Sequence, residues 1–142
     1  MNNQRNKLYN YIKNLTRNIS VLDVGARGGI GWPWTDFDNN FVDSILIEPD
    51  PIEAKNIQDN LSKSTNTVVL PVAFWNKICS MHLNLNKFPG TSSIFTSNLS
   101  FLDQFPDSDR FHADKIIKVD CTTIDYLIEN NQMPQFDFAK ID

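Results

Sequence analysis

A short apolar strand that runs directly into a glycine-rich turn constrains what this chain can fold into. The β-branched run at 19–24 is followed by Gly25-Ala-Arg-Gly-Gly29. Glycine permits a sharp turn and lets a ligand approach the backbone, which a Cβ would block. A turn in this place is typical of nucleotide sites in α/β proteins, where ligands bind beyond the carboxyl ends of the strands. Taken alone, it fits a loop that merely turns the chain equally well.

The glycine spacing excludes two common nucleotide sites. A nicotinamide-dinucleotide site needs Gly-x-Gly-x-x-Gly, but a pattern starting at Gly25 has Arg27 as its third residue. A pattern starting at Gly29 has Trp34 as its sixth residue. No Gly-Lys-Ser/Thr follows the turn, so a phosphate-binding P-loop is excluded as well.

Strands and helices alternate through the first half of the chain. The spacing of apolar residues predicts a helix over 3–18 and strands at 44–48 and 67–73. Between those strands, Asp50 is a helix N-cap and Glu53 completes a capping box. The alternation predicts an α/β fold with a Rossmann-like parallel sheet.

Further along the chain, the pattern of apolar residues changes to strict alternation with polar residues, a period of two. Alternation at 79–86, a Pro-Gly turn and a return strand at 91–95 predict an antiparallel hairpin inserted around 78–95. Beyond it, the sequence predicts a short helix around 99–105, a strand at 115–121, a helix at 122–129 and a last strand at 136–141.

Charge and composition exclude several classes of protein. The 13 Lys and Arg against 17 Asp and Glu give a net charge of −4, which argues against a nucleic-acid partner. No apolar run approaches the roughly 18 residues of a membrane span, and the N-terminus carries no apolar signal core. Cys79 and Cys121 lack the spacing of a zinc site or a disulfide scaffold. A cytoplasmic location is therefore expected.

An acidic residue closes the second strand. Glu48 stands where a carboxylate can accept hydrogen bonds from both hydroxyls of a ribose. A solvent-facing acid at a strand end is common in any α/β protein. Together with Asp23 before the glycine turn, however, Glu48 indicates an adenosine-containing ligand whose charged part is not a pyrophosphate.

Six segments, in this order, resemble the class I S-adenosylmethionine (SAM)-dependent methyltransferases, and within them the FkbM-type group. They are Val21-Leu-Asp-Val-Gly-Ala-Arg-Gly-Gly29, Ile47-Glu-Pro-Asp-Pro51, Pro71-Val-Ala-Phe74, Gly90-Thr-Ser-Ser-Ile94, Val119-Asp-Cys-Thr-Thr-Ile-Asp125 and Asp137-Phe-Ala-Lys-Ile-Asp142. Each segment alone is weak, whereas their order and spacing are specific.

The resemblance implies that SAM is the cofactor and where it binds. The methionine moiety is expected near Asp23–Gly25, the ribose on Glu48, and the adenine near Pro49–Asp50 and Ala73–Phe74. The cofactor-binding residues expected on this basis are Asp23, Gly25, Ala26, Arg27, Gly28, Glu48, Pro49, Asp50, Ala73 and Phe74. For Arg27, a carboxylate of the cofactor and a structural aspartate are both candidate partners.

The resemblance favours transfer to a hydroxyl oxygen of a sugar or a small secondary metabolite. Ser92 and Ser93 are candidate substrate contacts by resemblance, although they also suit an ordinary turn. Asp142 ends the last strand, where it could orient the acceptor hydroxyl, and is the candidate catalytic residue. No second metal ligand is visible beside it, so no metal is assigned. His82 and His112 fit solvated surface positions better than catalysis.

Members of this family continue beyond the Lys-Ile-Asp strand, so the resemblance implies one methyltransferase domain, 1–142, that is cut after its fourth core strand. Two alternatives stay open. One is a non-catalytic or split-gene fragment that binds an adenosine cofactor and needs a complementing C-terminal chain or a homo-oligomer. The other is a nicotinamide or nucleotide-sugar enzyme of a related fold, against which the glycine spacing counts.

Overall fold

The computed structural model describes residues 7, 10–11, 14–15, 17–36, 41–61 and 66–142. Most of the helix expected over 3–18 lies outside the described residues. The strands are β1 (Ile19–Val24), β2 (Val42–Ile47), β3 (Thr67–Leu70), β4 (Ala73–Phe74), β5 (Cys79–Asn86), β6 (Ala113–Thr122) and β7 (Phe138–Ile141). The α-helices are α2 (Pro51–Asn60), α3 (Leu99–Leu102) and α4 (Ile124–Glu129), and the 3-10 helices are η1 (Trp34–Asp36), η2 (Pro89–Thr91) and η3 (Ser108–Phe111).

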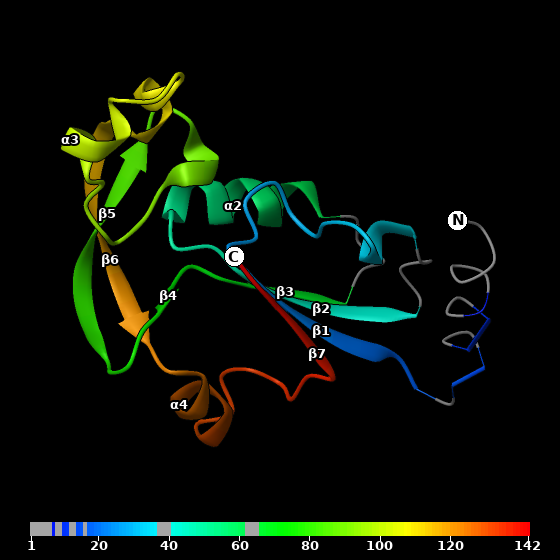
Figure 1. Cartoon of the computed structure of the whole chain (residues 1–142). Coiled ribbons are helices and arrows are strands. Elements are labelled where there is room, and N and C mark those ends of the chain that lie inside the picture. The colour runs from blue at the N-terminus through cyan, green and yellow to red at the C-terminus, as the bar shows by residue number, and fades with distance from the viewer. Residues whose placement is uncertain (1–6, 8–9, 12–13, 16, 37–40, 62–65) are drawn as a thin grey trace.

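The main sheet is parallel throughout and has the strand order β3-β2-β1-β7 (Figure 1). Its two central strands, β1 and β2, are buried along most of their length. Such near-continuous apolar strands are typical of a parallel sheet covered on both faces. The expected α/β fold with a Rossmann-like sheet of four parallel strands is thereby confirmed.

Helices α2 and α4 cover opposite faces of this sheet. Leu46 packs with Ile57 of α2, whereas Ile45 and Ile47 pack with Leu127 of α4. Because side chains alternate along a strand, neighbouring residues of β2 point to opposite faces. The arrangement is visible in Figure 1, where α2 and α4 lie on the two sides of the strands.

A second, three-stranded sheet has the order β4-β6-β5, with β4 parallel and β5 antiparallel to β6. The segment expected as one strand at 67–73 divides between the sheets, because Pro71 and Val72 separate β3 from β4. The antiparallel pairing expected within 78–95 is present as one bridge between Asn84 and Ser93. The long antiparallel partner of β5 is β6, although the sequence separates the two strands widely.

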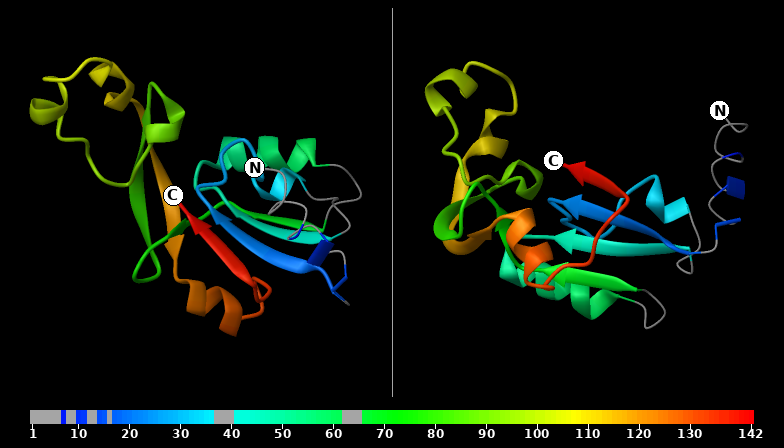
Figure 2. Two further views of the ribbon diagram at one scale, coloured as in Figure 1. Left: turned by 45° about the vertical axis from the view of Figure 1, so that its right-hand side comes forward. Right: turned by 90° about the horizontal axis from the view of Figure 1, so that it is seen from below.

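The strands of the main sheet point toward the second sheet. In Figure 2, the arrowheads of β1, β2 and β7 are directed at the end of the molecule that carries β5 and β6. The carboxyl ends of the parallel strands therefore lie between the two sheets, which is where ligands bind in open α/β folds.

Candidate functional site

A cavity of about 320 Å³ lies beyond the carboxyl ends of β1, β2 and β7. Gly25, Glu48 and Asp142 come directly after these three strands and all line it. The other lining residues are Arg27, Pro49, Leu83, Pro89, Gly90 and Ser92. The sequence predicted Gly25, Arg27, Glu48, Pro49, Ser92 and Asp142 as site residues, and the fold brings these six together.

Gly25 shapes the floor of the cavity. Its φ of 80° lies in the left-handed region that favours glycine. The amides of Gly25 and Ala26 both donate to the carbonyl of Ile47, which fixes the turn against β2. A Cβ on Gly25 would lie 3.4 Å from the Cβ of Asp142, so the absence of a side chain keeps this end of the cavity open.

Glu48 presents a largely buried carboxylate to the cavity. The residue is 3% exposed, and its Oε1 accepts a hydrogen bond of 2.9 Å from the amide of Asp50. Burial raises the pKa of Glu48, against the opposing effect of this hydrogen bond. A carboxylate has about four acceptor positions on its two oxygens, so one amide leaves capacity for ligand hydroxyls.

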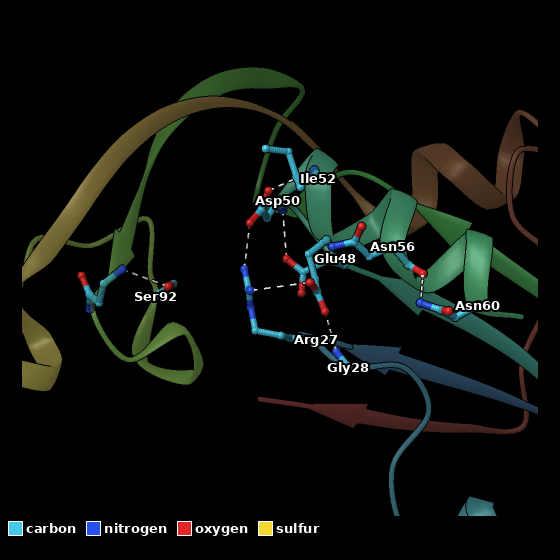
Figure 3. Close-up of polar contacts among 10 residues, drawn as sticks. Arg27, Gly28, Glu48, Asp50, Ile52, Asn56, Asn60 and Ser92 are labelled. Atoms are coloured by element: carbon cyan, nitrogen blue, oxygen red, sulfur yellow. Dashed lines mark hydrogen bonds and ion pairs between the residues drawn. The ribbon is translucent and has the colours of Figure 1, made fainter.

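Arg27 joins the glycine turn to the start of α2 (Figure 3). Its guanidinium donates to Oδ2 of Asp50 at 2.9 Å and lies 3.9 Å from Oε2 of Glu53. Asp50 caps α2 as predicted, since its Oδ1 accepts from the amide of Ile52 at 3.0 Å. Of the two candidate partners of Arg27, the structural aspartate is the one present, as Asp50.

Glu53 does not complete the expected capping box. Its Oε1 accepts a hydrogen bond of 3.0 Å from the amide of Gly28, and the amide of Asp50 binds Glu48 instead. The capping-box spacing does not hold here because the folded glycine turn places the amide of Gly28 within hydrogen-bond distance of the Glu53 side chain.

Lys140 is a functional candidate that the sequence reasoning missed. Its amine donates to Oδ1 of Asp23 at 2.9 Å and to Oδ2 of Asp142 at 2.5 Å. Asp23 is 1% exposed, and its Oδ2 has no hydrogen-bond partner among the described residues. Burial lowers the pKa of Lys140, but the two carboxylates together outweigh it and the pKa is raised. The i, i+2 spacing of Lys140 and Asp142 was a usable signal, because both side chains then lie on one face of the strand.

The remaining predicted residues lie outside this cavity. Asp50 lines an adjoining cavity of about 380 Å³ that shares Arg27, Pro89 and Ser92 with the first. Ala26 packs in the core, and Gly28 lines a separate hollow beside α2. Ala73 and Phe74 pack in two apolar clusters, and the hydroxyl of Ser93 accepts from the amide of Phe95. A role for these residues in binding stays a prediction.

Comparison with families of known proteins agrees with this geometry. The model of the methyltransferase FkbM domain matches residues 23–142. The chain belongs to the FkbM methyltransferase family. The resemblance of the six sequence segments to the FkbM-type group is thereby confirmed. Comparisons with curated proteins and with solved structures give no match.

Among the described residues of this FkbM domain, no group of three or more His, Cys, Asp or Glu residues is arranged to hold a metal ion. Within the same residues, no helix has both the length and the apolar character needed to cross a membrane.

Proposed function

We propose that this FkbM domain binds SAM in the cavity at the ends of β1, β2 and β7 and methylates a hydroxyl oxygen of a sugar or small secondary metabolite. The observation that carries the proposal is the convergence of Gly25, Glu48 and Asp142 on one cavity. Its volume of about 320 Å³ falls within the range of small-molecule sites, roughly 300–1,000 Å³. The adjoining cavity extends the space available to cofactor and acceptor.

The polar groups present suit the parts of SAM. Glu48 offers a buried carboxylate to the ribose hydroxyls, and Gly25 lets a ligand approach the backbone. The turn at Gly25 is where we place the methionine moiety, whereas the unpaired Oδ2 of Asp23, two residues earlier, is buried and does not line the cavity. When bound, SAM supplies a methyl group on a sulfonium, which is open to in-line displacement.

The protein's part in the reaction is to position the acceptor and to receive its proton. Asp142 lines the cavity, and Lys140 holds its carboxylate by a direct hydrogen bond. We assign to Asp142 the orientation of the acceptor hydroxyl and acceptance of its proton. Ser92 also lines the cavity, and its hydroxyl, which accepts a hydrogen bond from the amide of Asn86, can donate to an acceptor.

Isothermal titration of S-adenosylhomocysteine into the folded chain tests the cofactor part of the proposal. We expect micromolar binding, and a loss of about 10- to 100-fold in Glu48→Gln, because a hydrogen bond to a charged group contributes about 1.5–3 kcal/mol. Glu129→Gln, at an exposed position of α4, is the matched control and should bind normally. Absence of binding by a chain that circular dichroism shows to be folded would overturn the cofactor assignment.

Methyl transfer is tested separately with methyl-labelled SAM and a panel of sugars and hydroxylated metabolites. We expect label on an acceptor oxygen and its loss in Asp142→Asn, with binding of S-adenosylhomocysteine retained. Label on nitrogen or carbon would contradict O-methylation while leaving the cofactor site intact.

A further inference from the structure

The two cysteines of the chain meet in the second sheet. Cys79 of β5 and Cys121 of β6 are directly paired residues in the antiparallel register. Directly opposed residues point to the same face of a sheet, and both cysteines belong to one apolar cluster with Leu83 and Val119. Both are free thiols.

Opposed residues in an antiparallel sheet form either hydrogen-bonded or non-hydrogen-bonded pairs, and neighbouring hydrogen bonds show which type this pair is. The amide and carbonyl of Asn84 both bind Ser93, so they point away from β6. Backbone groups alternate in direction along a strand, and those of Cys79 therefore point toward β6. On the other strand, the carbonyl of Thr122 accepts from Trp75 beside β4, so the backbone groups of Cys121 point toward β5.

Cys79 and Cys121 are thus a hydrogen-bonded antiparallel pair, for which the Cα atoms are about 5.5 Å apart. Disulfides have Cα separations of about 4.4–6.8 Å, most often about 5.5–6 Å. The sheet register therefore holds the two thiols at the separation that a disulfide needs, and no backbone movement is required to reach it.

The two thiols differ in accessibility. Cys121 is 2% exposed, whereas Cys79 is half-buried. Burial raises the pKa of Cys121, and the adjacent Cys79 raises it further. Cys121 is therefore kept as a protonated thiol beneath the surface, and an oxidant from solvent meets Cys79 first.

We propose that Cys79 and Cys121 form a reversible disulfide when the chain meets a hydroperoxide. The sulfur of Cys79 attacks the peroxide, whose O–O bond breaks, giving a sulfenic acid and one water from hydrogen peroxide. The sulfur of Cys121 then attacks the sulfenic sulfur, releasing a second water and forming the S–S bond. Two thiols lose two protons and two electrons, and the peroxide is reduced to water.

This disulfide would close the loop from 79 to 121, which contains Pro89, Gly90 and Ser92 of the candidate site. A cross-link restricts the unfolded chain more than the folded one, so oxidation is expected to raise the melting temperature. The closure of this loop and the higher melting temperature depend only on the sheet and not on the proposed methyl transfer.

The test uses the full chain, exposed to graded hydrogen peroxide, blocked with N-ethylmaleimide and analysed by intact mass spectrometry. We expect a monomer that loses two hydrogens, takes up no N-ethylmaleimide and returns to two free thiols with dithiothreitol. A peptide map without reductant should show Cys79 linked to Cys121. In concentrated guanidinium chloride, where the register is lost, the same treatment should give less of this species.

Two variants distinguish the disulfide from random oxidation. Cys121→Ser should retain peroxide reactivity at Cys79 but accumulate oxygen adducts or linked dimers, while Cys79→Ser should leave the buried Cys121 unmodified. The wild-type result is sufficient if a variant fails to fold. Oxygen adducts on Cys79 without the intrachain link, or linked dimers as the main wild-type product, would overturn the proposal.

Discussion

The amine of Lys140 donates a hydrogen bond of 2.9 Å to the buried carboxylate of Asp23. The two residues are register partners on the adjacent parallel strands β7 and β1. Since Asp23 is 1% exposed, Lys140 is the cation that compensates its charge within the sheet.

Replacing Lys140 with methionine should therefore destabilise the chain by about 2–3 kcal/mol, because it leaves a buried carboxylate without its charged partner. Urea unfolding measures the change in the free energy of unfolding. In the double variant with Asp23→Asn, the loss should be clearly smaller than the sum of the two single losses. Additive losses would show that the pair contributes nothing specific.

Asp50 is predicted to stabilise the start of α2 in two separable ways. Asp50→Ala removes both the cap on Ile52 and the partner of Arg27, and should cost about 1–2 kcal/mol. Asp50→Asn keeps an oxygen that can cap the helix and loses only the ion pair, so its cost should be smaller. Thermal unfolding of both variants tests the order, and equal losses would contradict a role in capping.

Gly25 and Gly28 provide a matched pair for the candidate site. Their φ values are 80° and 82°, so alanine at either position should cost a similar strain of about 1–2 kcal/mol. Only at Gly25 does the added Cβ approach Asp142, whereas nothing lies within 4 Å of it at Gly28. We expect Gly25→Ala alone to weaken binding of S-adenosylhomocysteine by titration. Equal weakening in both variants would show that the effect comes from strain in the turn.

The ion pair of Arg17 and Asp137 should make stability depend on pH in the acid range. The two terminal guanidinium nitrogens of Arg17 each donate to the carboxylate of Asp137 at 2.7 Å, and the amide of Ser20 adds a third hydrogen bond. Arg17 first, and then Ser20, lowers the pKa of Asp137 from its ordinary value of 3.8 to about 2. The resulting stability is fully present above the ordinary pKa and is lost as the pH falls through about 2.

Arg17→Gln tests this dependence by urea unfolding at a series of pH values. The stability difference from wild type should be greatest at neutral pH and should shrink as the pH falls from about 5 toward 2. Lys55→Gln, on an exposed position of α2, is the control and should give a difference that varies little over this range. A constant difference for Arg17→Gln would contradict the assignment of the lowered pKa to this pair.

The sequence by itself determined the features that depend on local rules. The apolar runs predicted β1 and β2, and the Asp-Pro pair predicted the cap and start of α2. The glycines indicated a turn that needs positive φ. Gly25 and Glu48 were identifiable as candidate site residues because each directly follows a strand, and parallel strands end at the same edge of a sheet.

The tertiary structure alone decided which distant residues became neighbours. Pairing with β6 brings Cys79 to Cys121, and the register of β7 on β1 brings Lys140 to Asp23. The packed turn also gives Glu53 the amide of Gly28 in place of its own helix. No local pattern specifies these pairs, since strand partners and register are chosen by burial of whole faces and by the free energy of closing long loops.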